Sequence, residues 1–237
     1  MSNIGMIIEE RARDIGDFLV GRLLPFRKKR MIGPFIFLDH MGPVTLGPGE
    51  RFDVDPHPHI GLSTLTYLLD GTIVHRDSIG TVQEISPGAV NWMSAGKGVA
   101  HTERSKPEDD NKEMRMHGLQ IWVALPKDKE DMEPAFWHIA AGKLPVWENK
   151  GIFFKLIAGK AYGHESPVPV HSALFMLELK NEEASTFELD ETLKGESGIY
   201  IVEGGVEACG ETIGKGNLMV TKPGEACSFK LLANSHV

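Results

Sequence analysis

The stretch DPHPHIGLSTLTYLLDG (residues 55–71) combines a candidate β-strand with two closely spaced histidines. From Leu62 onward it reads as a β-strand, and two histidines, His57 and His59, precede that strand with one residue between them. Each histidine follows a proline, and proline favours extended backbone on both sides of itself. Side chains two residues apart on extended backbone share a face, so the two imidazoles are expected to point the same way.

Short apolar runs punctuated by turn residues continue along the whole chain of 237 residues, which has 26 glycines and 14 prolines. This pattern is typical of many short strands joined by turns, and long helical periodicity is absent. It predicts an all-β sandwich or barrel, of the jelly-roll type, and the best candidates for a short helix are polar segments such as 127–133. The expected strands are 35–38, 62–69, 73–77, 83–85, 89–93, 118–124, 153–158, 173–179, 198–202, 206–209, 218–221 and 227–231.

A weak internal repeat indicates two copies of one barrel. TYLLDG (66–71) resembles IYIVEG (199–204), and the eight-residue spacing of Gly88 and Gly96 is repeated by Gly216 and Gly224. The joint is expected in the charged, proline-rich segment 126–145. The resulting prediction is a metal-binding barrel over residues 1–134 and a second barrel without metal ligands over residues 135–237.

A second pair of candidate ligands has the same spacing as the first, since His101 and Glu103 are also two residues apart. If the two pairs lie on neighbouring strands and face inward, three imidazoles and one carboxylate converge on one point. Such a ligand set suits a divalent transition metal, Fe(II) first, with Mn, Ni, Cu or Zn as alternatives. Four protein ligands on an octahedral metal leave two positions open, as in non-haem oxygenases.

The repeat predicts one metal per chain. In its alignment the second copy carries no imidazole at the four ligand positions. His101 and Glu103 fall on Phe229 and Leu231, and His57 and His59 fall on Asp190 and Thr192. The histidines that stand singly are expected to have structural roles, among them His40, His75, His117, His138, His164 and His171.

Charge and composition restrict the partners. The net charge of −8 and the pI near 5.7 argue against direct binding to nucleic acid or to an anionic membrane. No secretory signal is recognised, and no apolar stretch approaches the roughly 20 residues of a membrane helix. We therefore expect a cytoplasmic protein in which Cys209 and Cys227 are reduced thiols.

Four segments resemble the signature segments of the pirins, a branch of the cupin superfamily. They are GPFIFLDHMGP (33–43), DPHPHIGLSTLTYLLDG (55–71), SPGAVNWMSAGKGVAHTE (86–103) and HGLQIWVALP (117–126). The resemblance implies a bicupin, two jelly-roll β-barrels packed face to face, with the metal held in the first barrel by His57, His59, His101 and Glu103.

The sequence departs from the family pattern in two ways. The glutamate that usually follows the cupin HxH motif is absent, so Glu103 supplies the carboxylate as in other pirins. Longer pirins also continue beyond the position of Val237, so this is either a short form or a truncated chain.

The resemblance implies two functions. One is a quercetin dioxygenase, which opens the ring of a flavonol-like, small aromatic substrate with O2. In that case Glu103 serves both as a ligand and as the catalytic base, and Phe52, Trp92 and Met93 are candidates for the substrate pocket. The alternative is a metal-containing regulator that binds a transcription factor or a metabolic enzyme, and a third reading is a purely structural metal. A monomer is the expectation from the family.

Overall fold

The computed structural model describes residues 4–15, 18–106, 112–189, 193, 195–222 and 228–237, and strands dominate this part of the chain. Only two short 3-10 turns accompany the strands there, η2 (Lys127–Lys129) and η3 (Ala141–Lys143). The strands are β1 (Ile4–Glu9), β2 (Arg11–Asp14), β3 (Leu19–Leu24), β4 (Phe35–Leu46), β5 (Asp53–His59), β6 (Leu62–Asp70), β7 (Ile73–Asp77), β8 (Val82–Ile85), β9 (Val90–Ser94), β10 (Val99–Arg104), β11 (Met114–Ala124), β12 (Ala135–Ile139), β13 (Val146–Asn149), β14 (Ile152–Ala161), β15 (His164–Glu165), β16 (Phe175–Asn181), β17 (Ser185–Glu188), β18 (Gly198–Tyr200), β19 (Gly205–Ala208), β20 (Glu211–Gly214), β21 (Asn217–Thr221) and β22 (Ser228–Leu231).

The chain forms two compact units. The histidine unit comprises Arg11–Pro25 and Pro34–Lys143. The C-terminal unit comprises Leu144–Val237 together with two earlier segments, Met1–Glu10 and Phe26–Gly33. The domain boundary between residues 134 and 135, and the face-to-face packing of the barrels, stay predictions.

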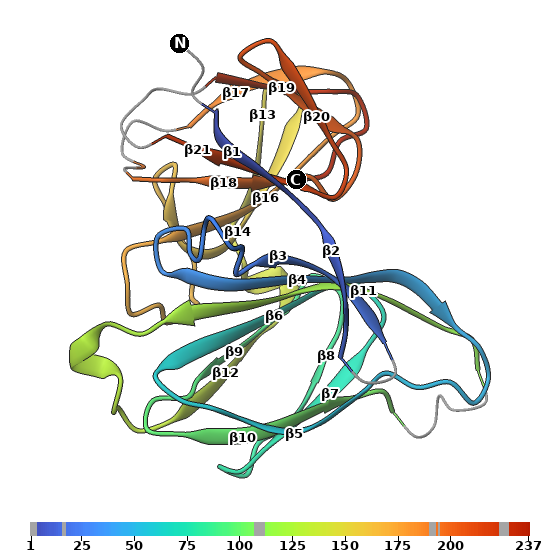
Figure 1. Ribbon diagram of the computed structural model, residues 1–237, viewed down its shortest axis with the longest axis vertical. Coiled ribbons are helices and arrows are strands. Elements are labelled where there is room, and N and C mark those ends of the chain that lie inside the picture. The colour runs from blue at the N-terminus through green and yellow to red at the C-terminus, as the bar shows by residue number, and fades with distance from the viewer. Residues whose placement is uncertain (1–3, 16–17, 107–111, 190–192, 194, 223–227) are drawn as a thin grey trace. The chain divides into compact units, whose positions relative to one another are not determined.

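The histidine unit contains two open antiparallel sheets (Figure 1). The larger has the strand order β12-β9-β6-β11-β4-β3-β2, and the smaller has the order β5-β10-β7-β8. The central strand β6 lies between β9 and β11 and is buried from Ser63 to Leu68. By contrast, β10 alternates between buried and exposed residues, as expected for a strand with one inward face.

The apolar core of the histidine unit is built mainly from inward-facing residues of these sheets. Its main cluster is Phe18, Val20, Met41, Leu46, Phe52, Leu68, Ile73, Ile85, Ala89 and Met116. A smaller cluster contains Met93, Ala95 and Val99, with Phe136 packed against it. Because Val99 begins β10, the smaller cluster anchors the strand that carries His101 and Glu103.

The C-terminal unit contains three smaller sheets. Their orders are β1-β21-β18, β13-β14-β15 with β16 paired to β14, and β17-β22-β19-β20. One apolar cluster fills the unit and includes Phe187, Phe229 and Leu231. The rings of Phe187 and Phe229 lie 5.3 Å apart, and their Cα atoms are partners between β17 and β22.

Each of the twelve expected strands corresponds to an observed one, with ends shifted by a few residues. The longest extension is β4, expected only as far as residue 38 and observed to Leu46. The expected helix at 127–133 is wrong, because only the 3-10 turn η2 forms there and it buries no side chain. A polar segment without an apolar stripe has nothing to pack against a core. The expected joint at 126–145 also contains β12, which pairs with β9.

Strand pairing agrees with the internal repeat. Tyr67 on β6 is paired with Val90 on β9, and the residues that the repeat aligns with them, Tyr200 and Leu218, are paired between β18 and β21. Gly88 and Gly216 also share a left-handed backbone, with φ of 79° and 77°. The aligned positions Asp190, Thr192 and Gly224 lie outside the described residues, as does Cys227.

Within the described ranges, no helix has the length and apolarity needed to span a membrane. The compartment, the oligomeric state and the absence of nucleic-acid contacts stay predictions.

Gly96 gives a test of how the fold positions β10. It lies in the turn between β9 and β10 with φ of +50°, and a Cβ added there would overlap the carbonyl oxygen of Met132. Gly96→Ala is therefore expected to lower the free energy of unfolding by about 2 kcal/mol or more, since strain and overlap act together. Gly142→Ala is the matched control, because a Cβ at Gly142 meets open space and its φ is not in the left-handed region.

Urea unfolding of both variants would measure the difference, and the control is expected to stay within about 0.5 kcal/mol of the parent. Equal stability of the two variants would contradict the role assigned to this turn.

Candidate metal centre

Three neighbouring strands, β5, β10 and β7, carry the candidate ligands on one sheet face. The central strand β10 sets the register, because His101 is paired with His57 on β5 and with Asp77 on β7. Two residues further along β10, Glu103 is paired with His75. The i,i+2 spacing of each pair therefore brings side chains from three strands together.

His57, His59 and His101 form one compact group, in which one ring nitrogen of each lies within 4.8 Å of the others. The Nε2 atoms of His59 and His101 are 2.9 Å apart. The ring centroids of His57 and His101 are 4.4 Å apart. Trp122 on β11 packs edge-on against His59, with ring centroids 5.0 Å apart, and so closes the group on the side of the larger sheet.

Hydrogen bonding and burial prepare these rings for a metal. His57 Nδ1 lies 2.8 Å from the carbonyl oxygen of Asp55, which can only accept, so Nδ1 donates and Nε2 is the nitrogen left for a metal. Burial, with a smaller contribution from His57 and His75, lowers the pKa of His59 to about 4. The same causes lower the pKa of His101 to about 2. Both rings are therefore neutral at pH 7, the form that binds metals.

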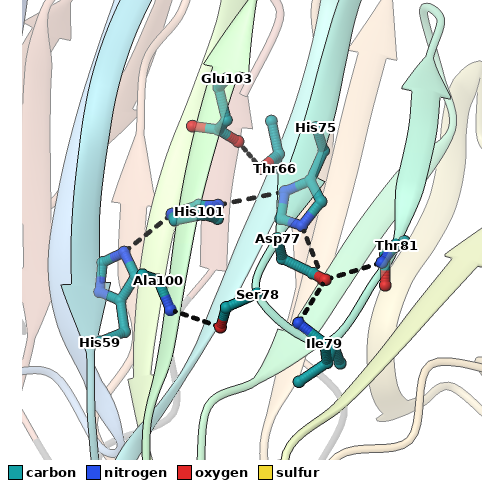
Figure 2. A network of polar contacts seen from close by, with 10 residues as sticks. All are labelled: His59, Thr66, His75, Asp77, Ser78, Ile79, Thr81, Ala100, His101 and Glu103. Atoms are coloured by element: carbon teal, nitrogen blue, oxygen red, sulfur yellow. Dashed lines mark hydrogen bonds and ion pairs between the residues drawn. The ribbon is translucent and has the colours of Figure 1, made fainter.

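Glu103 belongs to a second group, formed with His75 and His101, which is buried and whose ligand atoms all lie within 4.8 Å of one another. The Thr66 hydroxyl donates to Glu103 Oε1 over 2.8 Å, and His101 Nδ1 lies 3.1 Å from His75 Nδ1 (Figure 2). His101 is thus the residue that the two groups share. All four predicted ligands lie in this one polar cluster, although Glu103 is assigned to the second group.

The donor set fits a divalent transition metal. Neutral imidazoles and a buried carboxylate are the ligands that Fe, Mn, Ni, Cu and Zn accept, and no thiolate is present in the cluster. His57, His59, His101 and Glu103 would hold the metal, and this assignment stays a proposal. Among the described residues, no comparable group lies in the C-terminal unit, where the apolar residues Phe229 and Leu231 stand at the positions aligned with His101 and Glu103.

His75 is a residue that the sequence analysis missed, because it was assigned a structural role as a lone histidine. The structure places it against His101, with its ring 4.6 Å from that of Phe136. A signal was present in the sequence, since His75 and Asp77 have the same i,i+2 spacing as the two pairs that were recognised. They also lie on a strand whose predicted bounds, 73–77, match β7.

Several other single histidines make contacts away from the cluster. His40 Nε2 lies 2.8 Å from His117 Nε2, His138 Nδ1 lies 2.8 Å from Asn91 Oδ1, and the ring of His164 stacks on Trp147. Their expected structural roles agree with these contacts.

The three residues suggested for a substrate pocket are almost completely buried. Phe52 packs edge-on against Phe18, Trp92 donates to Ser94 Oγ over 3.1 Å, and Met93 lies in the small cluster with Val99. All three contribute to the core, and their role in a pocket stays a prediction. A separate hollow of about 820 Å³ lies along β3 and β4 and is lined by His40, Pro43, Arg51 and neighbouring residues, but by none of the cluster.

Comparisons with known proteins show which family and which fold this chain resembles. The family model described as Pirin matches residues 18–123. A "Pirin-like protein" of Caulobacter vibrioides is 46% identical over 99% of this chain and 82% of its own length. A Pseudomonas aeruginosa protein, named as a candidate quercetin 2,3-dioxygenase, is 44% identical over 86% of this chain but only 63% of its own length.

A solved structure titled quercetin 2,3-dioxygenase, from Acinetobacter baumannii, superposes with a TM-score of 0.89 at 36% identity, over 98% of this chain and 76% of that one. The likeness extends over nearly the whole chain, and it confirms the all-β bicupin class expected from the sequence.

The lowered pKa values of His59 and His101 predict how the metal-free protein responds to acid. The unfolded chain takes up a proton at each ring near pH 6.5, whereas the folded protein does not until about pH 4 or lower. Stability is therefore retained above pH 6.5 and falls between pH 6 and pH 5, by up to about 1.4 kcal/mol per pH unit for each ring.

Urea unfolding of the metal-free protein across this range would measure that slope. His59→Gln is expected to make the slope shallower, whereas His164→Gln, at an exposed site, leaves it unchanged. The same slope in all three proteins would show that the buried rings do not control acid stability.

Proposed function

The chain belongs to the pirin family, and from this premise we propose that it is a metal-dependent dioxygenase of the quercetinase type, acting on a flavonol-like substrate with O2. The observation that carries the proposal is a pair of adjoining candidate ligand groups in the histidine unit, His57–His59–His101 and His75–His101–Glu103, which share His101. Two of the similar proteins bear the name quercetin 2,3-dioxygenase, which supports the same reaction class.

One metal ion per chain is proposed, held by His57, His59, His101 and Glu103. Fe(II) is favoured because mixed imidazole and carboxylate ligation is typical of non-haem iron, with Mn, Ni, Cu and Zn as alternatives. Four protein ligands leave positions open on an octahedral ion, whereas structural sites tend to be closed. When bound, the metal would supply a Lewis acid that orients the substrate oxygen and O2 relative to each other.

The chain's own contribution is to position the substrate hydroxyl and accept its proton. Glu103 is the proposed base, and the Thr66 hydroxyl holds one of its oxygens at 2.8 Å. Gln120 Oε1 on β11 lies 3.0 Å from Thr66 Oγ1 and is a second acceptor beside the same hydroxyl. Because Glu103 is also a proposed metal ligand, it can take the proton of the substrate only by leaving the metal or by sharing its second oxygen with the proton. Phe52, Trp92 and Met93 stay candidates for the apolar lining, and O2 and the aromatic substrate are the proposed small-molecule partners.

Oxygen uptake tests the proposed reaction. The purified protein would be stripped of metal, reloaded anaerobically with Fe(II) and mixed with quercetin in an oxygen-electrode cell. We expect uptake equal to substrate loss in the parent protein and none in the His57→Ala/His101→Ala double variant, which lacks two ligands.

One bound metal per chain without uptake would contradict the dioxygenase proposal and leave the metal site intact. It would favour another substrate or the alternative of a metal-containing regulator.

Glu103→Ala tests the proposed base. Loss of a general base is expected to lower kcat by about 10²–10⁴-fold, and Fe content measured on the same sample separates this loss from loss of metal. Comparable turnover at full metal occupancy would show that another group takes the proton. Thr66→Val is a milder companion change, because it keeps the carboxylate but removes the hydroxyl that orients it.

A further inference from the structure

We propose that His75 and Asp77 are positioning residues that fix the proton and the ring orientation of His101, so that His101 presents an unprotonated Nε2 to the metal. The proposal rests on the metal site proposed above but not on the dioxygenase reaction. It assigns a function to two residues that the mechanism does not otherwise use.

The four residues His59, His101, His75 and Asp77 form a continuous chain of contacts (Figure 2). His101 Nε2 faces His59 Nε2 at 2.9 Å, which makes Nε2 the nitrogen on the side of the ligand group. On the opposite edge of the same ring, Nδ1 faces His75 Nδ1 at 3.1 Å. His75 Nε2 then lies 3.1 Å from Asp77 Oδ2.

The donors and acceptors along this chain allow one arrangement when His101 binds a metal through Nε2. His101 must then carry its proton on Nδ1 and donate it to His75 Nδ1. His75 consequently carries its own proton on Nε2 and donates it to the Asp77 carboxylate, which only accepts when ionised. The Asp77 carboxylate, at the end of this series of hydrogen bonds, therefore determines which nitrogen of His101 is free to bind the metal.

The position of Asp77 is fixed by the backbone. Its other oxygen, Oδ1, accepts hydrogen bonds from the amides of Ile79 at 3.1 Å and Thr81 at 2.8 Å, in the turn between β7 and β8. The side chains of His75 and Asp77 are 3% and 0% exposed, so water does not compete for these contacts. The ring of Phe136 lies against His75 and limits its rotation.

Asp77→Asn should reverse the donor and acceptor in each hydrogen bond between Asp77, His75 and His101. The two backbone amides at Oδ1 require an acceptor there, so the amide oxygen of the new side chain occupies that position and its NH₂ faces His75. His75 Nε2 must then accept, which moves its proton to Nδ1. His101 Nδ1 must accept in turn, which moves its proton to Nε2, the nitrogen intended for the metal.

The experiment uses the full chain and Zn(II), a diamagnetic probe. Zinc affinity would be measured by competition with a fluorescent chelator, and proton positions by long-range ¹H–¹⁵N correlation spectra of histidine-labelled protein. For the zinc-loaded parent we expect protons on His101 Nδ1 and His75 Nε2. Asp77→Asn is expected to lower zinc affinity by about 10–100-fold and, without metal, to show the protons on His101 Nε2 and His75 Nδ1.

Two further variants separate positioning from general damage. His75→Phe keeps an aromatic ring against Phe136 but removes the acceptor for His101, so a similar loss of affinity is expected. Glu178→Gln is the matched control. It alters a carboxylate–histidine pair of the same kind in the C-terminal unit, where Glu178 Oε1 lies 2.8 Å from His236 Nε2, and should leave zinc affinity unchanged.

The outcomes distinguish the two proposals. A parent protein that binds no zinc would overturn the metal site and this inference with it. Zinc bound to a parent in which His101 Nδ1 carries no proton would overturn this inference alone, because the metal would then lie between His75, His101 and Glu103. That measurement needs no variant, so it decides the matter even if Asp77→Asn fails to fold.

Discussion

The position of β10 between β5 and β7 is the constraint on which the site depends. Its register sets His101 opposite His57 on one side and opposite Asp77 on the other, and it sets Glu103 opposite His75. A slip of β10 by one residue would turn His101 and Glu103 to the other face of the sheet, away from the side chains of β5 and β7. The turn at Gly96 and the packing of Val99 hold the start of β10, so backbone geometry outside the cluster determines the chemistry inside it.

The two units have related strand pairings, but one encloses a cluster of histidines and the other an apolar core. In the histidine unit the strands enclose neutral rings that remain uncharged because water is excluded from them. In the C-terminal unit, β22 carries Phe229, which the repeat aligns with His101 on β10. There β22 pairs with β17, and Phe187 and Phe229 meet in an apolar core. Buried polar groups require partners, and the histidine unit supplies them by linking its rings to one another, to Thr66 and to Asp77.

The sequence predicted twelve of the 22 strands in the described residues, and it suggested the four proposed ligands, because both depend on local patterns. Glycine and proline mark the turns, and i,i+2 spacing is read directly from the chain. It did not predict β12, whose pairing with β9 depends on contacts distant in sequence, or the failure of the helix at 127–133. The spacing of His75 and Asp77 was a local signal for His75, but its contact with His101 lies across two strands and cannot be read from one segment. The internal repeat aligned His57 with Asp190, whereas the residue paired with Phe229 on the neighbouring strand is Phe187.

Pro56 and Pro58, which precede the two histidines of β5, have a consequence for self-association. β5 is the edge of its sheet, and Pro56 and Pro58 are exposed along it. Alternate residues of a strand direct their amides to opposite edges, and proline has no amide hydrogen to donate, so the outer edge of β5 lacks a donor at two successive positions. A strand from another molecule finds no regular ladder to extend there. The residues that hold the histidines in extended backbone thus also protect an exposed sheet edge from self-association.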